Sequence, residues 1–547
     1  MSQTISFDYW NLQIKPTFYH LDKFMNEQIK ILLVLSLALS TFTMINCEPK
    51  PEPQNSVPEE MNEEEISSAE LLKQLDSQDV FIRSQATIQL GSRKEKASIP
   101  KLRSFLKDKE PGVRAGAAIA LGELSDKKST ETIALLLGSD KENPKEVYLD
   151  ALARMKDPSA GSHITPLLNS EDATLRLIAV DTLVQINAQS QGSAILALAL
   201  KNKDREKDKN FAMAMGKLKV KSAESYLIKL TDVQDESPTL AAAYLALGRI
   251  KSYKAVEILV RALKHPYSKG KENASQALIE IGDKKAISLV FPLLAIDESE
   301  TRMYVTDVLS EIPSLEAGEK ALGFLNSDKK FAWGSAAKIV GRQKYKPGRE
   351  KIEQMLILES TPERDLFAEA LGWLGDKGSI PVLRKVLTSK SKEGRYGSAW
   401  SLGILGAKEA LPDLEAALND SDPKLVSFAL EAIGAIAEVS SLATLEAFMS
   451  NRPKMAPQIL SAIGQIKNDS ARIVIEKYAK SNDPDVFRPA LEEIAKLKNK
   501  ESLPLLFEIL NSDNADKRKI TYYALTAITG EHFRTKSEWN NWRNKNK

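Results

Sequence analysis

From about Ser77 onward, the hydrophobic positions follow a repeated five-residue motif: a small residue, an aliphatic residue, usually glycine, any residue, and then leucine or isoleucine. Examples are ALGEL (120–124), ALGRI (246–250) and ALGWL (370–374). We call the aliphatic residue in the second place the marker. Successive markers are 30, 31 or 32 residues apart without a gap: Leu90, Leu121, Leu152, Leu183, Met215, Leu247, Leu278, Leu309, Val340, Leu371, Leu402, Ile433, Ile463, Ile494 and Leu525. A constant period of this length is typical of a solenoid or a propeller.

The spacing inside one period predicts two helices. In residues 113–124 (VRAGAAIALGEL) apolar side chains are four, four and three residues apart, which places them on one helical face. Residues 98–108 (SIPKLRSFLKD) predict a second helix. Several periods carry a proline near the first turn of that helix, where a missing N–H is tolerated: Pro100, Pro381, Pro412 and Pro504. The sequence has no sustained period-two runs, so it predicts an all-α fold, a right-handed α-solenoid of about fifteen helix pairs over residues 69–530.

The repeated unit resembles the HEAT repeat, in the short form also called PBS-lyase HEAT-like. The matching features are D-x-x-x-x-x-R at 108–114, the A-x-A-L-G-x-L motif, and turns such as Ser421-Asp422-Pro423. The resemblance covers about residues 70 to 530. It implies that the helix with the marker lines a concave surface and that this surface binds other proteins.

The positions of that helix that face the concave surface are mostly Ser, Gln, Glu and Lys, except in the eighth to twelfth units. Those units carry aromatic and charged side chains: Met303, Tyr304, Asp307, Lys338, Arg342, Asp365, Glu369, Trp373, Tyr396, Trp400 and Phe428. Trp333 lies one position out of register with them. Because tryptophan, tyrosine and arginine dominate interface hot spots, these residues form the candidate partner-binding site. The alternative is that the rings fill gaps between repeats where the pattern has only alanine.

The C-terminal residues 531–547 predict a cap on the array. The segment resembles the ending often seen on bacterial HEAT arrays, with two tryptophans three residues apart. Thr535 and Glu538 have the spacing of a capping box at the start of a helix. Trp539 and Trp542 would share one face of that helix and cover the last repeat; ligand recognition by these rings is the alternative.

Composition and motifs give little support for catalysis, metal binding or nucleic-acid binding. Of the 547 residues, 76 are Lys or Arg and 74 are Asp or Glu, so the chain lacks the basic excess typical of nucleic-acid binding. The four histidines are scattered without ligand spacing, and no nucleophile, phosphate-loop or zinc motif is present. We therefore expect no cofactor, no metal, no nucleic acid and no enzymatic activity. A lyase-type HEAT-like enzyme that acts on an envelope substrate is the alternative.

The N-terminal region predicts export. Residues 25–46 start with a short polar stretch that contains Lys30 and continue with an apolar run too short for a membrane span but suitable for a signal peptide. The run ends at Cys47, the only cysteine of the chain. This ending resembles the lipobox of bacterial lipoproteins, with Met44, Ile45 and Asn46 before the cysteine, and implies that Cys47 is lipidated. An uncleaved anchor and a signal peptide cleaved elsewhere are alternatives.

The flanking segments complete this prediction. Residues 47–68 are rich in proline and glutamate, which favours an extended tether after the lipid anchor. Residues 1–24 fit no signal peptide, so we expect a start-site artefact or disorder there, with translation from Met25. The predicted protein is a monomeric scaffold, exported and anchored by lipid to a bacterial membrane, with the outer membrane favoured. A cytoplasmic adaptor with a misread N-terminus is a further alternative.

Overall fold

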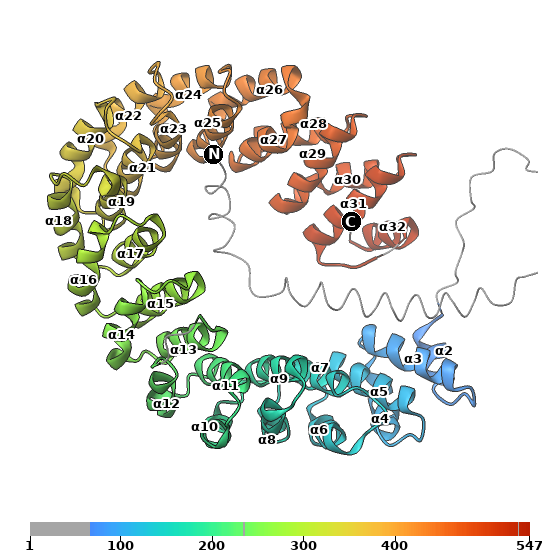
Figure 1. The fold of residues 1–547 in the computed structure, drawn as a ribbon. Helices are drawn as coiled ribbons and strands as arrows, with labels where there is room; N and C mark the ends of the chain where they lie inside the picture. Colours follow the sequence, from blue (N-terminus) through green and yellow to red (C-terminus); the bar gives the residue numbers. More distant parts are fainter. Residues whose placement is uncertain (1–65, 233–235, 534, 547) are drawn as a thin grey trace, which may run out of the picture. The chain divides into compact units, whose positions relative to one another are not determined.

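The computed structural model describes residues 66–232, 236–533 and 535–546. The predicted leader, Cys47 and most of the tether lie outside these residues. In the described part every regular element is a helix and no strand occurs, so the expected all-α solenoid is confirmed (Figure 1). Within the same residues, no helix has the length and the apolar character that a membrane crossing requires.

The helices form two layers. The layer on the inner side of the array contains the fifteen odd-numbered helices from α3 to α31, and each of them holds one marker residue, so we call them marker helices (Figure 1). Their bounds are α3 Val80–Ser92, α5 Pro111–Glu123, α7 Lys145–Met155, α9 Ala173–Gln185, α11 Arg205–Lys217, α13 Pro238–Arg249, α15 Ser268–Ile281, α17 Ser299–Glu311, α19 Trp333–Arg342, α21 Arg364–Leu374, α23 Arg395–Ile404, α25 Pro423–Ile436, α27 Ala456–Gln465, α29 Pro484–Leu497 and α31 Ala515–Thr529.

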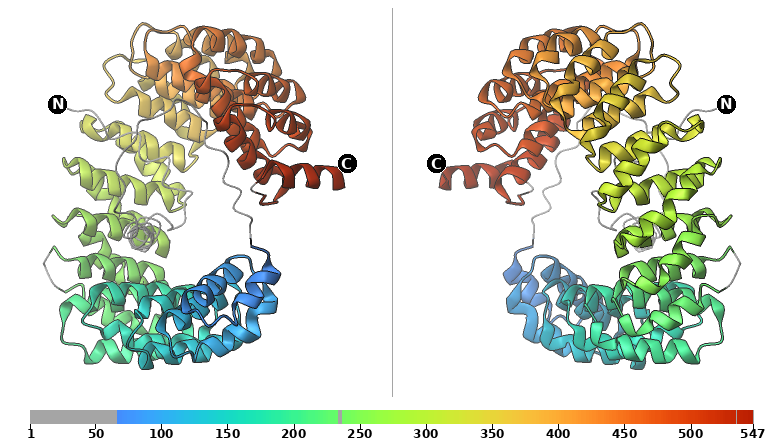
Figure 2. Two further views of the ribbon diagram at one scale, coloured as in Figure 1. Left: turned by 90° about the vertical axis from the view of Figure 1, so that its right-hand side faces the viewer. Right: turned by 90° about the vertical axis from the view of Figure 1, so that its left-hand side faces the viewer.

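Helices that are mostly shorter form the outer layer, as the side views in Figure 2 also show. Their bounds are α2 Ser68–Gln74, α4 Ile99–Phe105, α6 Thr130–Ser139, α8 Gly161–Ile164, α10 Gly192–Lys201, α12 Glu224–Lys229, α14 Val256–Ala262, α16 Lys285–Val290, α18 Leu315–Phe324, α20 Arg349–Ile357, α22 Ile380–Leu387, α24 Leu411–Ala417, α26 Leu442–Asn451, α28 Asp469–Ala479 and α30 Leu503–Ile509. The last helix, α32, spans Lys536–Lys545.

The marker residues form the centre of the core. All of them are at most 2% exposed, and burial of such a side chain contributes about 1.5–3 kcal/mol to folding. The glycine after the marker brings neighbouring marker helices together. A Cβ atom at Gly122, for example, would lie 2.9 Å from the Cα atom of Ala151 in the next marker helix. A larger residue at Gly122 would force these two helices apart.

The D-x-x-x-x-x-R motif closes the loop before a marker helix. Arg114 Nη1 donates to the carbonyl oxygens of Asp108 and Lys109, at 2.9 and 3.0 Å. The same guanidinium joins two repeats, because its Nε donates to Asp140 at 2.9 Å. The Asp140 side chain is 1% exposed, and its hydrogen bond with Arg114 lowers the pKa of this carboxyl group far below its usual range. The motif therefore satisfies backbone carbonyls and links successive units.

Most marker helices end at a left-handed residue four positions after the marker. This backbone conformation caps the helix and usually favours glycine. Several units have glycine there, as at Gly282 and Gly375, but others have lysine, including Lys94 and Lys219. The eighth unit has Pro313 at this position, and the proline ring fixes φ near −65°, which excludes the left-handed region.

A side chain from the ninth unit completes the end of α17 in place of that cap. Gln343 Nε2 donates to the carbonyl oxygens of Leu309 and Ile312, at 2.6 and 2.8 Å. Its Oε1 accepts a hydrogen bond from the backbone N–H of Ser314 at 2.8 Å. The helix end in the eighth unit is therefore satisfied by the next repeat.

The C-terminal helix α32 covers the last repeat. Thr535 and Glu538 form the predicted capping box, which confirms that part of the sequence interpretation. Trp539 is fully buried, and its ring lies edge to face against Phe533, with 5.0 Å between centroids. Trp542 stacks on Phe507 of α30 at 6.4 Å. Both indoles thus contribute to packing at the end of the array.

Candidate functional site

The exposed face of the marker helices is formed by two positions in each unit. These positions lie two residues before and two residues after the marker, and we call them the minus-two and plus-two columns. The residues between them are buried in α19, where Lys338 is half-buried, Ile339 and Val340 are buried, and Arg342 is exposed. A partner that approaches the inner side of the array would meet these two columns first. We call this face the inner surface.

Ion pairs between consecutive repeats run along the inner surface. Lys217 and Asp181 lie 2.7 Å apart, and Lys338 and Asp307 lie 3.1 Å apart. Arg154 pairs with Glu123, and Arg342 pairs with Glu311, in the same way. Each pair joins one marker helix to the next. Because these side chains are only partly buried, the pairs contribute at most about 1 kcal/mol each.

In the tenth and eleventh units, directly after the pairs of the eighth and ninth units, tryptophans take column positions. Trp373 takes the plus-two position of α21, and Trp400 takes the minus-two position of α23. Their rings lie edge to face with centroids 5.5 Å apart and an interplanar angle of 66°. The guanidinium of Arg342 lies 6.0 Å from the Trp373 ring centroid, so one cation from these ion pairs already contacts the aromatic pair.

A glycine allows the Trp400 ring to lie close to the neighbouring helix. A Cβ atom at Gly372 would be 2.9 Å from Cζ3 of Trp400 and 2.5 Å from Oγ of Ser401. Both indoles are nevertheless half-buried, and the neighbouring Ile404 is 51% exposed. The pair therefore packs between repeats and also forms part of the surface.

A second aromatic pair lies beside the first. Tyr396 of α23 stacks on Phe428 of α25, with centroids 5.9 Å apart. Lys424 Nζ lies 4.4 Å from the Tyr396 centroid. The Tyr396 hydroxyl donates to Asp422, and burial together with this hydrogen bond raises the pKa of Tyr396 to about 12. The bond from Tyr396 in turn lowers the pKa of Asp422. The Tyr396 hydroxyl therefore ties this pair to the residue that caps the start of α25.

Glu369 is a carboxylate without a partner in this region. Among the described residues it makes no hydrogen bond and no ion pair, because Lys338 is bound to Asp307 and the next column residue is Trp400. Burial and the nearby Asp365 raise the pKa of Glu369 to about 7, although Lys338 and Lys424 oppose this shift. Asp365 itself accepts a hydrogen bond from the backbone N–H of Gly397 at 2.9 Å.

The other residues that the sequence predicted lie at the margins of this region. Met303 and Tyr304 are half-buried on α17, and Tyr304 packs against the core. Trp333 is the first residue of α19, and its Nε1 donates to the carbonyl oxygen of Ser327 at 3.1 Å. The structure brings the tryptophans of α21 and α23 together, whereas Trp333 contributes to a turn.

Four residues of this region were missing from the sequence prediction: Glu311, Ile404, Lys424 and Glu431. The first, second and fourth occupy the minus-two or plus-two column, so a strict count from each marker would have identified them. Lys424 lies outside both columns and reaches the aromatic pair through its long side chain. Only the structure could identify it.

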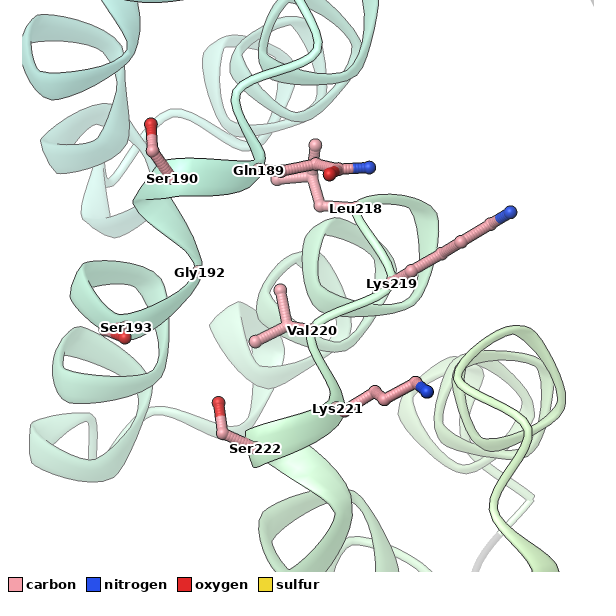
Figure 3. A pocket seen from close by; sticks show the side chains of 9 residues that line it. All are labelled: Gln189, Ser190, Gly192, Ser193, Leu218, Lys219, Val220, Lys221 and Ser222. Carbon is pink, nitrogen blue, oxygen red and sulfur yellow. The ribbon is translucent and has the colours of Figure 1, made fainter.

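No other region of the described residues offers a more elaborate site. A hollow of about 300 Å³ lies where η5 (Gln189–Gln191) meets η6 (Lys221–Ala223). Figure 3 shows Lys219 and Lys221 extending away from the serines that line it, and Val220 contacts Gly192. In the described part of the chain, no three His, Cys, Asp or Glu side chains are grouped so that they could hold a metal ion.

Comparisons with known proteins identify the repeat. The family model for HEAT repeats matches residues 68–147, 192–278, 350–434 and 441–526, which together are more than half of the chain. Deoxyhypusine hydroxylase-B from Oryza sativa subsp. japonica is 28% identical over 244 residues, which are 42% of this chain and 77% of that protein.

Solved structures with a similar fold include importin beta. That chain is 13% identical, with a TM-score of 0.45, and the match covers 84% of this chain and 79% of importin beta. The Kap95:Nup1 complex gives a TM-score of 0.47 at 11% identity, over 84% of this chain and 75% of that one.

Proposed function

Because this chain belongs to the family of HEAT-repeat proteins, we propose that it is a scaffold that binds another protein on its inner surface, at Trp373 and Trp400. One observation carries the proposal: two half-buried indoles lie edge to face at column positions directly after the ion-paired eighth and ninth units. In the eighth and ninth units, by contrast, the column residues bind each other. Aromatic side chains in such a position contribute strongly to interfaces because their burial yields much apolar contact.

Site-specific photo-crosslinking in living cells tests this proposal. A photoreactive phenylalanine in place of Ile404 would lie beside the tryptophans, and the same residue in place of Gln185 provides a matched control. Both positions are exposed and belong to the plus-two column. We expect a crosslinked protein at position 404 that is missing at position 185 and is lost when Trp373→Ala and Trp400→Ala are combined. Identical products at both positions would contradict the proposal.

The scaffold is further proposed to be an exported lipoprotein of the cell envelope. Support comes from the sequence, in which an apolar run precedes Cys47 and a segment rich in proline and glutamate follows it. Mass spectrometry of the N-terminal peptide tests this: a diacylated Cys47 is expected as the first residue. A mature chain that begins with an unmodified Met1 or Met25 would exclude the lipid anchor. The monomeric state and the lack of nucleic-acid binding likewise stay predictions.

An enzymatic role is the second candidate, because one relative is named as a hydroxylase. If the activity were shared, the purified chain, supplied with O2 and a reductant, would insert one oxygen atom of O2 into a C–H bond of a deoxyhypusine substrate, and the other oxygen atom would leave as water. Intact-mass measurement of such a substrate after incubation with the full chain would detect the change. We expect no added mass, in agreement with the prediction that the chain is not an enzyme. A hydroxylated product would contradict that prediction.

A further inference from the structure

The minus-two column carries two carboxylates on either side of Trp400. From α19 to α25 its residues are Lys338, Glu369, Trp400 and Glu431. In the eighth unit of the same column, Asp307 is bound by Lys338 of the following repeat. Glu369 has no such cation, since Trp400 occupies the next place. The column thus changes from paired charges to unpaired carboxylates around an indole.

Glu431 is the second carboxylate of this column without a partner. It is exposed on α25, one repeat after Trp400, and among the described residues it makes no hydrogen bond and no ion pair. Asp365 adds negative charge near Glu369, and Asp422 adds it beside Tyr396. The cations that face these groups are Lys424, Lys392 and Lys338, and Lys338 is already bound to Asp307. Around the tryptophan pair the charge balance of the inner surface is therefore acidic, although the whole chain is nearly neutral.

The rings of this region already attract cations from the chain itself. Arg342 lies over Trp373, and Lys424 lies over Tyr396 and at 6.0 Å from the Phe428 centroid. The negative faces of aromatic rings attract guanidinium and ammonium groups, and a neighbouring carboxylate strengthens this attraction. Indole and unpaired carboxylate together therefore fit a basic side chain better than a neutral or acidic one.

Resting on the proposed scaffold function, we infer that the segment of the partner that binds here is basic, with arginine or lysine side chains that contact Glu369, Trp400 and Glu431. Adjacent helices pack about 9 Å apart, so two repeats separate the carboxylates by roughly 18 Å. An extended chain rises about 3.3 Å per residue, which places the two basic residues about six positions apart.

Charge excludes two other occupants of this surface. The chain's own segment 48–65 contains seven glutamates and one lysine, so it would be repelled by the carboxylates. Nucleic acid is repelled for the same reason, because its phosphates are negative. A basic protein segment remains the occupant with complementary charge.

Peptide binding to the purified full chain at pH 8 tests the inference. The probes are a fluorescein-labelled peptide of four Ser-Gly-Arg repeats and its counterpart with citrulline, which has nearly the same shape as arginine but no charge. Fluorescence anisotropy should give about tenfold tighter binding for the arginine peptide. Glu369→Gln with Glu431→Gln should abolish that difference. The matched control, Glu492→Gln, alters an exposed residue of the same column in α29 and should change affinity by less than about twofold.

The outcomes separate this inference from the proposed function. Equal binding of the two peptides, or no effect of the double variant, would contradict the inference that the partner's segment is basic. Crosslinking at position 404 could still capture a partner protein, and mass spectrometry would then identify the crosslinked peptide of that partner. If this peptide were neutral or acidic, the scaffold function would stand and the inference of a basic segment would fail. Thermal melts of the variants control for folding, and the isosteric Gln substitutions should leave them within a few degrees of wild type.

Discussion

The indole rings of Trp373 and Trp400 meet edge to face across two consecutive marker helices, with 5.5 Å between their centroids. Aromatic pairs of this geometry contribute about 0.5–1.5 kcal/mol beyond the area that they bury. We expect the effects of Trp373→Ala and Trp400→Ala on local unfolding free energy to be non-additive by about 1 kcal/mol. Hydrogen exchange of α21 and α23 in the two single variants and the double variant measures this coupling. Additive effects would show that the rings act independently.

Glu369→Gln should stabilise the protein at high pH only. Burial raises the pKa of Glu369 to about 7, above the value near 4.3 of an unfolded chain. The neutral carboxyl is favoured in the fold, so its stabilising contribution is lost as pH rises through 7. We expect equal stability of variant and wild type near pH 4 and an advantage for the variant on the order of 2 kcal/mol at pH 8. Urea titrations across this range would reveal a constant difference if the shift were absent.

Asp140→Asn should destabilise the contact between the second and third units at neutral pH. The hydrogen bond from Arg114 holds the pKa of Asp140 low, so this carboxylate stabilises the fold above about pH 4 and loses its effect as pH falls below that value. The expected loss is about 1.5–3 kcal/mol at pH 7, because Arg114 loses its charged hydrogen bonds to the buried Asp140 and keeps only the exposed Glu142 as an anionic partner. Hydrogen exchange of α5 and α7 reports it. Glu142→Gln, which alters an exposed partner of the same arginine, should cost less than about 1 kcal/mol.

Lys219→Gly should stabilise the fifth unit. Lys219 has a φ angle of +57°, a conformation that costs a residue with a side chain about 1 kcal/mol but costs glycine almost nothing. The same substitution two residues later, Lys221→Gly, lies in a 3-10 helix with ordinary backbone angles and should destabilise by about 0.5–1 kcal/mol. Opposite signs in urea unfolding would verify the prediction, whereas a loss in both variants would contradict it.

The sequence was sufficient to predict the array, because marker residues of constant spacing must all lie in the core. Each odd-numbered helix from α3 to α31 contains the residue that the spacing indicated. The resemblance to HEAT repeats implied which helix faces the inner side. The spacing of the markers is a local periodicity, which a single chain displays directly.

The contacts of the candidate site were less accessible to sequence reasoning. Arg342 and Trp373 were both predicted as site residues, but their contact depends on side-chain conformations in two different repeats. The isolation of Glu369 became visible only when Lys338 was seen to bind Asp307. Each charged side chain has several possible partners about thirty residues away in the neighbouring repeats. Periodicity alone cannot decide which of these pairs forms.

The amide side chain of Gln343 has a consequence for anyone who divides this chain into fragments. A fragment that stops after the eighth unit would leave the carbonyl groups of Leu309 and Ile312 without their donor. The eighth and ninth units therefore belong together, while a marker helix followed by a left-handed residue such as Lys94 is capped by backbone N–H groups of its own unit. Shortened versions of the protein should be cut elsewhere, and mechanical pulling should separate other repeats before these two.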